Sequence, residues 1–347
     1  MIPHARKFRP AALRRALPET DAAVLDDVSR GGKVLWVSST GGHLAELMRI
    51  EQELRPRPDS LWVTFDTPQS QVLLAGRRRR FVDYISPRDI GGTLRGAGTL
   101  YRILHQERFD YCISAGAAIA VSGLPLAALR GIRTYYVESV ARSQGPSLTG
   151  RMLALAPRVR TLSQYEGWSS GRWPYAGTVL DSFAVTDRLP AQAPRKILVT
   201  LGTIRPYRFD RAVDAVLSVL AAGDQVTWQL GSTSRTGLPG TTVTETSPDE
   251  LADLARASDV VVSHAGVGSL LQLLGLGHVP VLAVRSKRHG EHVDDHQEQI
   301  ARAMIRRGLG CGLDREHPSR QPLAAAASRT VHNRSNHHEP LSQRNPL

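Results

Sequence analysis

Residues 263–297 contain most of the side chains in this sequence that could bind or transform a ligand. An apolar run at residues 260–262 ends in a turn of small residues that includes Gly266, Gly268 and Ser269, and a leucine-rich helical pattern follows. A strand, a glycine loop and a helix N-terminus in this order let backbone N–H groups and the positive end of the helix dipole face an anion. We therefore predict that the loop holds the diphosphate of a nucleotide-type ligand and that Ser269 caps the helix. The alternative is a turn that only joins the strand to the helix.

A dense polar cluster follows the next apolar run, residues 280–284. Sites in open α/β sheets gather beyond the carboxyl ends of the strands, which is where this cluster should lie. An exposed polar loop would have a similar composition. The cluster consists of Arg285, Lys287, His289, Glu291, His292, Asp294, Asp295, His296 and Gln297.

The elements that must position these groups occur in two series. In the first half, strands are expected at residues 34–38, 61–65, 81–85, 111–114 and 134–137, and helices near 44–54, 94–106 and 118–129. In the second half, strands at 196–200 and 225–230 alternate with helices at 209–220 and 251–257. Each series begins with a strand that runs into a glycine turn, which predicts two Rossmann-like α/β domains that face each other across a cleft.

Changes in composition suggest where these domains begin and end. We expect a flexible basic leader at residues 1–32, an N-terminal domain at 33–180, a strand-poor linker at 181–194 and a C-terminal domain at 195–315. Residues 316–347 lose periodicity and are expected to form a disordered tail.

Charge narrows the choice of partners. The 347 residues include 44 Lys and Arg against 32 Asp and Glu, which gives a net charge of +12 and favours phosphorylated ligands or an anionic membrane surface. Nucleic acid is disfavoured because aromatic residues make up only 5% and do not alternate with basic ones. No run approaches the roughly 18 apolar residues that span a bilayer, so we expect a cytoplasmic protein. The leader and the charge run Arg77 to Arg80 could hold it peripherally on the membrane.

Three stretches resemble a known family. They are SSTGGH at residues 38–43, the set formed by residues 113–116, VESVAR at 137–142 and SLTGR at 147–151, and the pair SHAGVGS at 263–269 and GEHVDDHQ at 290–297. Over residues 33–312 the chain resembles the acceptor and donor subunits of the dolichol-linked UDP-GlcNAc transferase, fused into one polypeptide. It is also similar to the paired bacterial capsule and exopolysaccharide glycosyltransferases and, more distantly, to the GlcNAc transferase that forms lipid II.

The resemblance implies a GT-B fold and an inverting, metal-independent hexosyltransferase of bacterial cell-surface polysaccharide synthesis. Its substrates would be a UDP-sugar of the GlcA, Gal or GlcNAc type and a polyprenyl-diphosphate-linked sugar, with no cofactor. Asp294-Asp295 lacks the Asp-x-Asp spacing of metal-dependent glycosyltransferases, so we expect no metal ligand there.

Inversion requires a base that takes the proton of the acceptor hydroxyl. His43 is the first candidate because it follows two glycines at a helix start, where imidazole stays neutral, and its ordinary pKa of about 6.5 suits proton transfer. A helix-positioning or phosphate-binding role is the alternative. Glu138, at the end of an apolar strand, is the second candidate.

The remaining site residues divide between the two substrates. The acceptor side would use Thr40, Gly41, Gly42, Arg142 and Arg151. The UDP-sugar side would use Thr203, Ser263, His264, Gly266, Gly268, Ser269, Gln272, His289, Glu291, His292, Asp295 and Gln297. Many relatives have Glu where this chain has Gln272, and a neutral amide there leaves open a second function, that of a catalytically inactive nucleotide-sugar-binding partner.

Overall fold

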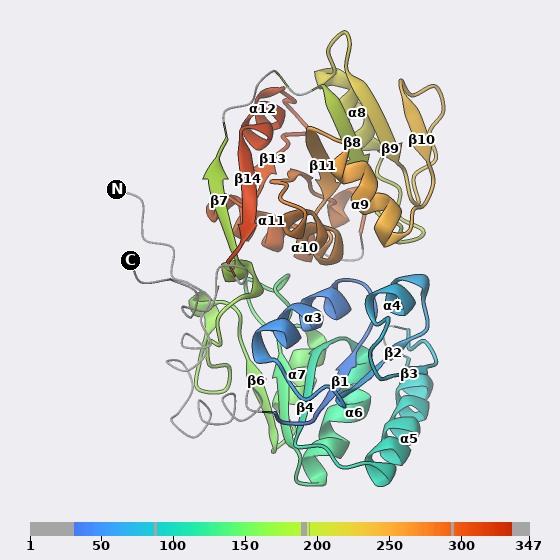
Figure 1. Ribbon diagram of the computed structural model, residues 1–347, viewed down its shortest axis with the longest axis vertical. Coiled ribbons are helices and arrows are strands. Elements are labelled where there is room, and N and C mark those ends of the chain that lie inside the picture. Colours follow the sequence, from blue (N-terminus) through green and yellow to red (C-terminus); the bar gives the residue numbers. More distant parts are fainter. Residues whose placement is uncertain (1–30, 87–88, 189–192, 194, 293–294, 335–347) are drawn as a thin grey trace, which may run out of the picture.

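The computed structural model describes residues 31–86, 89–188, 193, 195–292 and 295–334, and these form two α/β domains, one above the other in Figure 1. Residues 1–30 of the expected leader and residues 335–347 lie outside the described residues. None of the described helices is long and apolar enough to span a membrane.

The N-terminal domain is built on a six-stranded parallel sheet in the order β3-β2-β1-β4-β5-β6. Its strands are β1 (Val34–Ser38), β2 (Leu61–Phe65), β3 (Arg79–Val82), β4 (Tyr111–Gly116), β5 (Arg133–Val137) and β6 (Val159–Leu162). Its helices are α3 (Gly42–Leu54), α4 (Pro68–Leu73), α5 (Ile90–Gln106), α6 (Ala118–Leu129) and α7 (Leu148–Ala154). Separate apolar clusters cover the two faces of the sheet, as doubly wound domains require.

The C-terminal domain repeats this order as β10-β9-β8-β11-β12-β13, again parallel. Its strands are β8 (Lys196–Thr200), β9 (Gln225–Gln229), β10 (Thr241–Val243), β11 (Val260–His264), β12 (Val281–Ala283) and β13 (Cys311–Gly312). Its helices are α8 (Asp210–Val219), α9 (Pro248–Arg256), α10 (Val267–Gly275), α11 (His296–Arg306) and α12 (Gln321–Ala327). The paired sheets confirm the predicted α/β class with two Rossmann-like domains.

Several expected elements needed correction. The strand expected at residues 81–85 is β3, which begins two residues earlier, inside the charge run. Arg77 pairs with Glu51, and Arg78 binds both Glu107 and the carbonyl of Asp59. Arg77 and Arg78 therefore bind to other parts of the N-terminal domain and do not point only into solvent.

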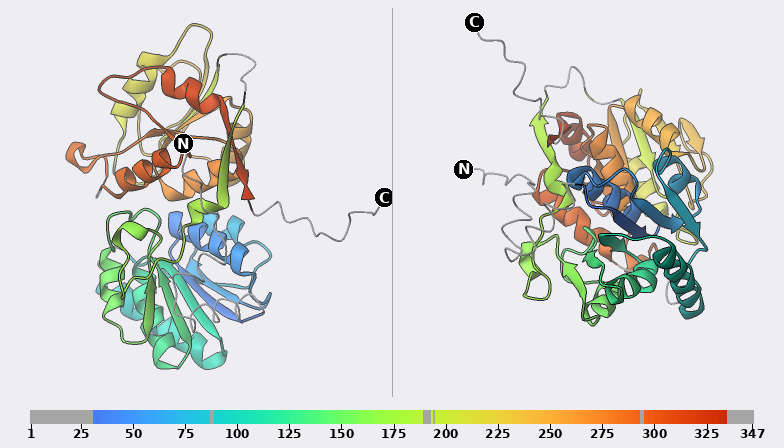
Figure 2. Two further views of the ribbon diagram at one scale, coloured as in Figure 1. Left: turned by 90° about the vertical axis from the view of Figure 1, so that its left-hand side faces the viewer. Right: turned by 60° about the horizontal axis from the view of Figure 1, so that its bottom comes forward.

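The expected linker and tail contain regular structure. β7 (Phe183–Asp187) lies in the segment expected to be strand-poor, and it pairs antiparallel with β14 (Arg329–Asn333). With α12, β14 shows that the disordered tail was wrong for residues 321–333. The two strands run together beside the C-terminal domain down to the domain junction (Figure 2, left). The domain boundaries themselves stay a prediction.

One apolar cluster contains residues of both domains. Val140, Leu180, Leu270 and Leu274 are among its buried members, and Ala45 and Ile50 of α3 pack against it. The domains therefore share part of their core, and α3 and α10 face each other across the junction (Figure 1).

Candidate active site

The two glycine loops that the sequence singles out meet at the domain junction. A Cβ added to Gly42 would lie 2.8 Å from Cβ of Val267, and one added to Gly268 would lie 3.5 Å from the backbone N of Gly42. Helices α3 and α10 therefore begin beside each other. The first N–H groups of a helix have no intrahelical acceptor and carry a partial positive charge, so two such ends face one place.

The first loop is shaped by its neighbours in the N-terminal domain. Gly41 has a φ of +79°, which favours glycine, and its N–H donates to Oε1 of Gln69 at 2.7 Å. The ring of His43 packs on Gly116, where an added Cβ would lie 3.0 Å from Cε1 of His43. Burial, with smaller contributions from His296 and Arg142, lowers the pKa of His43 to about 4, so this imidazole is neutral at pH 7.

The second loop is built around His264, which is 8% exposed. A Cβ at Gly202 would lie 2.6 Å from Nε2 of His264, and a Cβ at Gly266 would also clash with the ring. The imidazole thus fills the space between two glycine backbones, and Nδ1 lies 3.4 Å from the carbonyl of Thr200. Burial, with the charge of Arg285, lowers the pKa of His264 to about 4.

The predicted cap of α10 is wrong. The N-cap is Gly266, which makes no side-chain cap bond, and Ser269 is the third residue of the helix. The hydroxyl of Ser263 donates to the carbonyl of His264 at 2.9 Å, so it stabilises the backbone where the loop begins. The start of α10 consequently offers backbone N–H groups, and Ser269 is a first-turn side chain beside them.

Arg285 connects the loop after β8 with the loop after β12. It is fully buried, and it donates to the carbonyls of Tyr207 and Glu291 at 2.8 Å and of Leu201 at 2.7 Å. Desolvation lowers the pKa of Arg285 to about 10, so it remains charged at pH 7. From the sequence, Arg285 was predicted only as one member of a polar cluster, because its partners are backbone carbonyls that the pattern of residues does not reveal.

The polar cluster after β12 divides into buried and exposed members. Glu291 is buried and accepts from Arg211 at 2.8 Å and from the N–H of Ser286 at 2.9 Å. The buried ring of His292 stacks on Tyr207, with centroids 5.9 Å apart, and meets His296 edge-on at 4.7 Å.

His289 is exposed and accepts a hydrogen bond from Arg288, and Asp295 is exposed and accepts from the N–H of Lys287. Asp294 lies outside the described residues. Of the predicted residues in this segment, Glu291, His292 and Gln297 are thus buried, whereas His289 and Asp295 are exposed.

Three further donor-side predictions have distinct settings. Thr203 is exposed at the start of the loop after β8. Gln297 is buried, and its Oε1 has no hydrogen-bond partner among the described residues, which is typical of a group whose partner is a ligand or water. Nε2 of Gln272 donates to the carbonyl of Pro248 at 2.6 Å, so its Oε1 and the second N–H of Nε2 are left for a ribose hydroxyl.

Glu138 has the environment of a structural residue. Its carboxylate accepts from the N–H groups of Ser139 and Ser147 and from the hydroxyls of Ser147 and Tyr136, at 2.8 to 3.1 Å. Burial raises its pKa, and these donors oppose the rise. Four internal donors occupy both oxygens, which favours a structural role over the catalytic one that we predicted.

Glu46, which the sequence did not reveal, lies beside Glu138. It is fully buried on α3, one turn after His43, and burial raises its pKa to about 8. In the sequence it is one polar residue in an amphipathic helix, and only the fold shows that it points inward.

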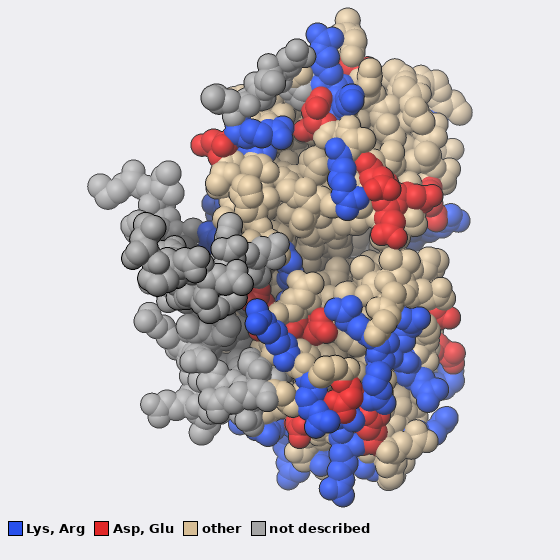
Figure 3. Space-filling model, in the orientation of Figure 1, with Lys and Arg blue, Asp and Glu red and all other residues tan. Residues whose placement is uncertain are grey.

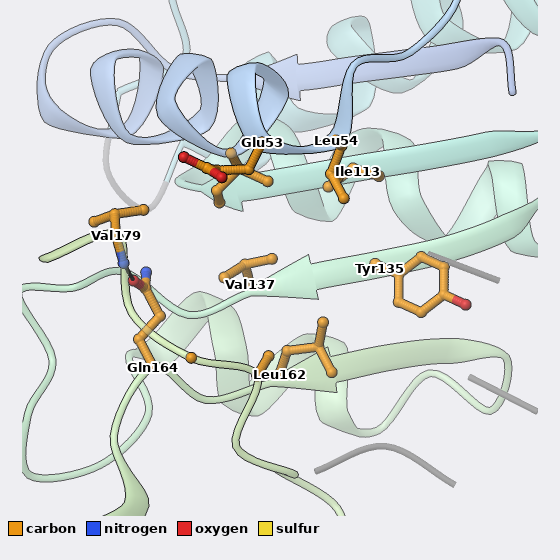
Figure 4. A pocket seen from close by; sticks show the side chains of 11 residues that line it. Glu53, Leu54, Ile113, Tyr135, Val137, Leu162, Gln164 and Val179 are labelled. Atoms are coloured by element: carbon orange, nitrogen blue, oxygen red, sulfur yellow. Dashed lines mark hydrogen bonds between the residues drawn. The ribbon is translucent and has the colours of Figure 1, made fainter. Parts of the chain in front are cut away.

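In the part of the chain that the structure describes, the remaining acceptor-side predictions are not brought together by any contact between them. Thr40 and Arg142 are half-buried, and Arg151 is exposed on α7. An apolar cavity lies between α3 and strands β4, β5 and β6 (Figure 4). It contains none of the predicted site residues. Among the described residues, no three His, Cys, Asp or Glu side chains are grouped as metal ligands would be.

Comparisons with known proteins agree with this architecture. Residues 196–343 match the glycosyltransferase family 28 C-terminal domain. The chain is similar to the UDP-N-acetylglucosamine–N-acetylmuramyl-(pentapeptide) pyrophosphoryl-undecaprenol N-acetylglucosamine transferase of Geobacillus thermodenitrificans, with 24% identity over 88% of this chain and 84% of the relative.

Two further likenesses are partial or structural. A stretch of 59 residues, 17% of this chain, is 41% identical to part of the UDP-N-acetylglucosamine transferase subunit ALG13 of Yarrowia lipolytica, covering 28% of that protein. The crystal structure of MurG from Acinetobacter baumannii superposes with a TM-score of 0.53 at 16% identity, over 84% of this chain and 88% of that one.

The fold is therefore GT-B, the two-domain architecture of one large class of glycosyltransferases. Within that class, the C-terminal part of this chain, residues 196–343, matches the family 28 C-terminal domain, and the chain as a whole is similar to the Geobacillus N-acetylglucosamine transferase.

The lowered pKa of His264 predicts how stability changes with pH. The unfolded chain binds a proton at an ordinary histidine pKa near 6.5 and the folded site only near 4, so stability is lost as the pH falls through this window. Between pH 7.5 and pH 5 we expect the wild type to lose about 2 kcal/mol more unfolding free energy than His264→Gln. Urea denaturation at both pH values measures this, with the exposed His317→Gln as control. Equal losses in wild type and His264→Gln would contradict the assignment.

Proposed function

We propose that this protein is an inverting, metal-independent hexosyltransferase that moves a sugar from a UDP-sugar to a polyprenyl-diphosphate-linked acceptor. The donor would be of the GlcA, Gal or GlcNAc type, and the product would enter bacterial cell-surface polysaccharide synthesis. The relatives support this, since the Geobacillus enzyme is named for GlcNAc transfer to a pyrophosphoryl-undecaprenol substrate. The location would be the cytoplasmic face of the membrane.

The meeting of the two glycine loops is the observation that carries the proposal. Departing UDP carries growing negative charge on its β-phosphate, and this charge must be stabilised for the bond to break. The start of α10 supplies N–H groups and a dipole for it, and the adjacent start of α3 adds a second positive end. Each helix end contributes roughly 0.3–1 kcal/mol toward a nearby anion, and more where water is excluded.

His43 is the proposed base. The acceptor hydroxyl oxygen attacks the anomeric carbon, the bond from that carbon to the β-phosphate oxygen breaks, and the hydroxyl proton passes to an imidazole nitrogen of His43. A base must be unprotonated before the reaction, and the lowered pKa of His43 meets this condition at pH 7. Attack from the face opposite the leaving group inverts the anomeric centre.

The sugar and the ribose are assigned to the C-terminal domain. We propose that Gln297, His292 and Glu291 face the hexose, since all three are buried polar side chains between β12 and the first turn of α11. We propose that Thr203, which is exposed after β8, approaches the diphosphate. For the ribose we retain Gln272 through its Oε1. Gln272 is neutral and one of its N–H groups already binds the carbonyl of Pro248. A catalytically inactive nucleotide-sugar-binding protein therefore remains the second candidate.

Transfer is tested with UDP-GlcUA, UDP-Gal, UDP-Glc, UDP-GlcNAc and UDP-GalNAc, each with membranes that contain lipid-linked acceptors. We expect UDP release with at least one donor, and a decrease of roughly a hundredfold or more in kcat for His43→Ala because the base is lost. Gly98→Ala, on an open helix surface of α5, serves as the control. Tight UDP binding with no release from any donor would support the inactive partner, and an unchanged His43→Ala rate would exclude His43 as the base.

An anionic membrane surface is the proposed second partner, and α7 offers the best contact. Leu148, Met152 and Leu155 recur at helical spacing and are 62%, 49% and 85% exposed, with the exposed Arg151 between them. Apolar side chains interspersed with arginine suit the interface of an anionic leaflet. Lys and Arg also crowd the N-terminal domain in Figure 3. The earlier candidate run, Arg77 to Arg80, is less suitable because Arg77 and Arg78 have internal partners.

Binding to vesicles of phosphatidylglycerol and phosphatidylcholine checks this surface. The triple variant Leu148→Ser, Met152→Ser, Leu155→Ser should partition at least about tenfold less than the wild type, since each buried leucine contributes on the order of 1.5–3 kcal/mol. Val72→Ser with Ile305→Ser, two exposed apolar residues on α4 and α11, is the matched control. If the triple variant binds as well as the wild type, α7 is not the contact.

A further inference from the structure

A short segment after β5, residues 139–144, forms a polar link between the two domains. The hydroxyl of Ser143 donates to the carbonyl of Gln299 at 3.4 Å, and the N–H of Gln144 donates to Oε1 of Gln299 at 3.2 Å. Gln299 belongs to α11, whose first turn also carries Gln297. The position of this segment is therefore coupled directly to a helix of the donor side.

Two buried carboxylates hold the base of the segment. Glu46 accepts from the hydroxyl of Ser139 at 3.0 Å and from the N–H of Val140 at 2.8 Å. Glu138 accepts from the N–H of Ser139 at 3.1 Å and from that of Ser147 at 2.8 Å. Ser139 is thus fixed by both carboxylates, through its side chain to one and through its backbone to the other.

Gln164 completes the anchor. Its Nε2 donates to Glu46 and, at 3.0 Å, to the carbonyl of Glu138, while its Oε1 accepts from the N–H of Val179 at 2.9 Å (Figure 4). Glu46 therefore faces three donors and is fully buried. A buried acceptor set of this kind is strong only when every member is satisfied, and it is costly to disturb.

The segment carries Arg142 into the junction. Val140 and Ala141, which precede Arg142, are buried in the apolar cluster that also contains Val267, and Val267 packs against Gly42, the residue before His43. The carbonyl of Arg142 accepts from Nε1 of Trp168 at 3.0 Å, which fixes the backbone on its far side. One helix, α3, holds both His43 and the carboxylate that anchors this segment, a turn apart.

We propose that Glu46 is a positioning residue for the sugar transfer: by holding Ser139 and Val140, it sets Arg142 beside His43 and the segment against Gln299. This inference rests on the proposed function. Glu46 touches no substrate and acts through the segment. Above its pKa of about 8, Glu46 is ionised and all three neighbours can donate to it. A glutamine of the same shape would turn an NH₂ group toward one of them and leave two donors opposed, so the variants are compared at pH 9.

Glu46→Gln is the deciding variant, with Glu51→Gln as the matched control, since Glu51 lies on the same helix and pairs with Arg77 at the surface. We expect amide hydrogen exchange in residues 139–144 to speed up in Glu46→Gln and not in Glu51→Gln. The affinity for UDP should stay within about twofold, because the partners of Glu46 are Ser139, Val140 and Gln164 and none of them belongs to either glycine loop. We expect kcat/KM for the acceptor to fall about tenfold or more.

Ser139→Ala distinguishes positioning from general destabilisation. If Glu46 acts through Ser139, the losses in kcat/KM from Glu46→Gln and Ser139→Ala will not add in the double variant. A parallel fall in UDP affinity would instead indicate a merely structural role and overturn the proposal.

The proposal would also be overturned if Glu46→Gln transferred sugar at the wild-type rate, or if amide hydrogen exchange in residues 139–144 of this variant were as slow as in the wild type. Absence of transfer by the wild type would refute the proposed function and the catalytic part of this inference. The exchange measurement needs no substrate, and in that case it still decides whether Glu46 holds the segment.

Discussion

The close packing of α3 against α10 is the contact on which the rest of this structure depends. Gly42 lies against Val267 with no space for a side chain, and the apolar cluster around Leu270 and Leu274 continues across the domain boundary. Two helix starts with partial positive charge are thereby held side by side, an arrangement that is unfavourable alone and favourable around an anion. A diphosphate ligand fits this constraint, and so does the presence of glycine at the contact.

Buried polar groups maintain the loops around this contact. In the C-terminal domain, Arg285 binds three carbonyls of two loops, and the ring of His264 separates two glycine backbones. In the N-terminal domain, Glu46 and Glu138 divide the donors of one segment between them. Leaving any one of these groups unpaired would cost about 1–3 kcal/mol or more, so each domain holds its loops in a single arrangement.

The sequence predicted well what depends on local pattern. The central strands of both sheets and both glycine loops were recognised because apolar runs and small-residue turns are local signals, as at residues 34–43 and 260–269. The edge strands β6, β10 and β13 were not predicted. β14 was missed because its polar residues resemble a tail, and it is ordered by pairing with β7 some 140 residues earlier. Ser269 was misassigned because a helix start is decided by backbone geometry. Glu138 was given a catalytic role since its four donors, like the inward direction of Glu46, appear only in three dimensions.

Hydrogen exchange with and without UDP tests most directly the claim that the ligand site spans both domains. UDP should slow exchange at the start of α10, residues 266–270, and also in the first glycine loop, residues 40–44, by about tenfold or more at saturation, because an anion at the junction accepts from one helix start and orders the other. Protection confined to the C-terminal domain would contradict a shared site. Protection in neither loop would contradict nucleotide binding at this junction altogether.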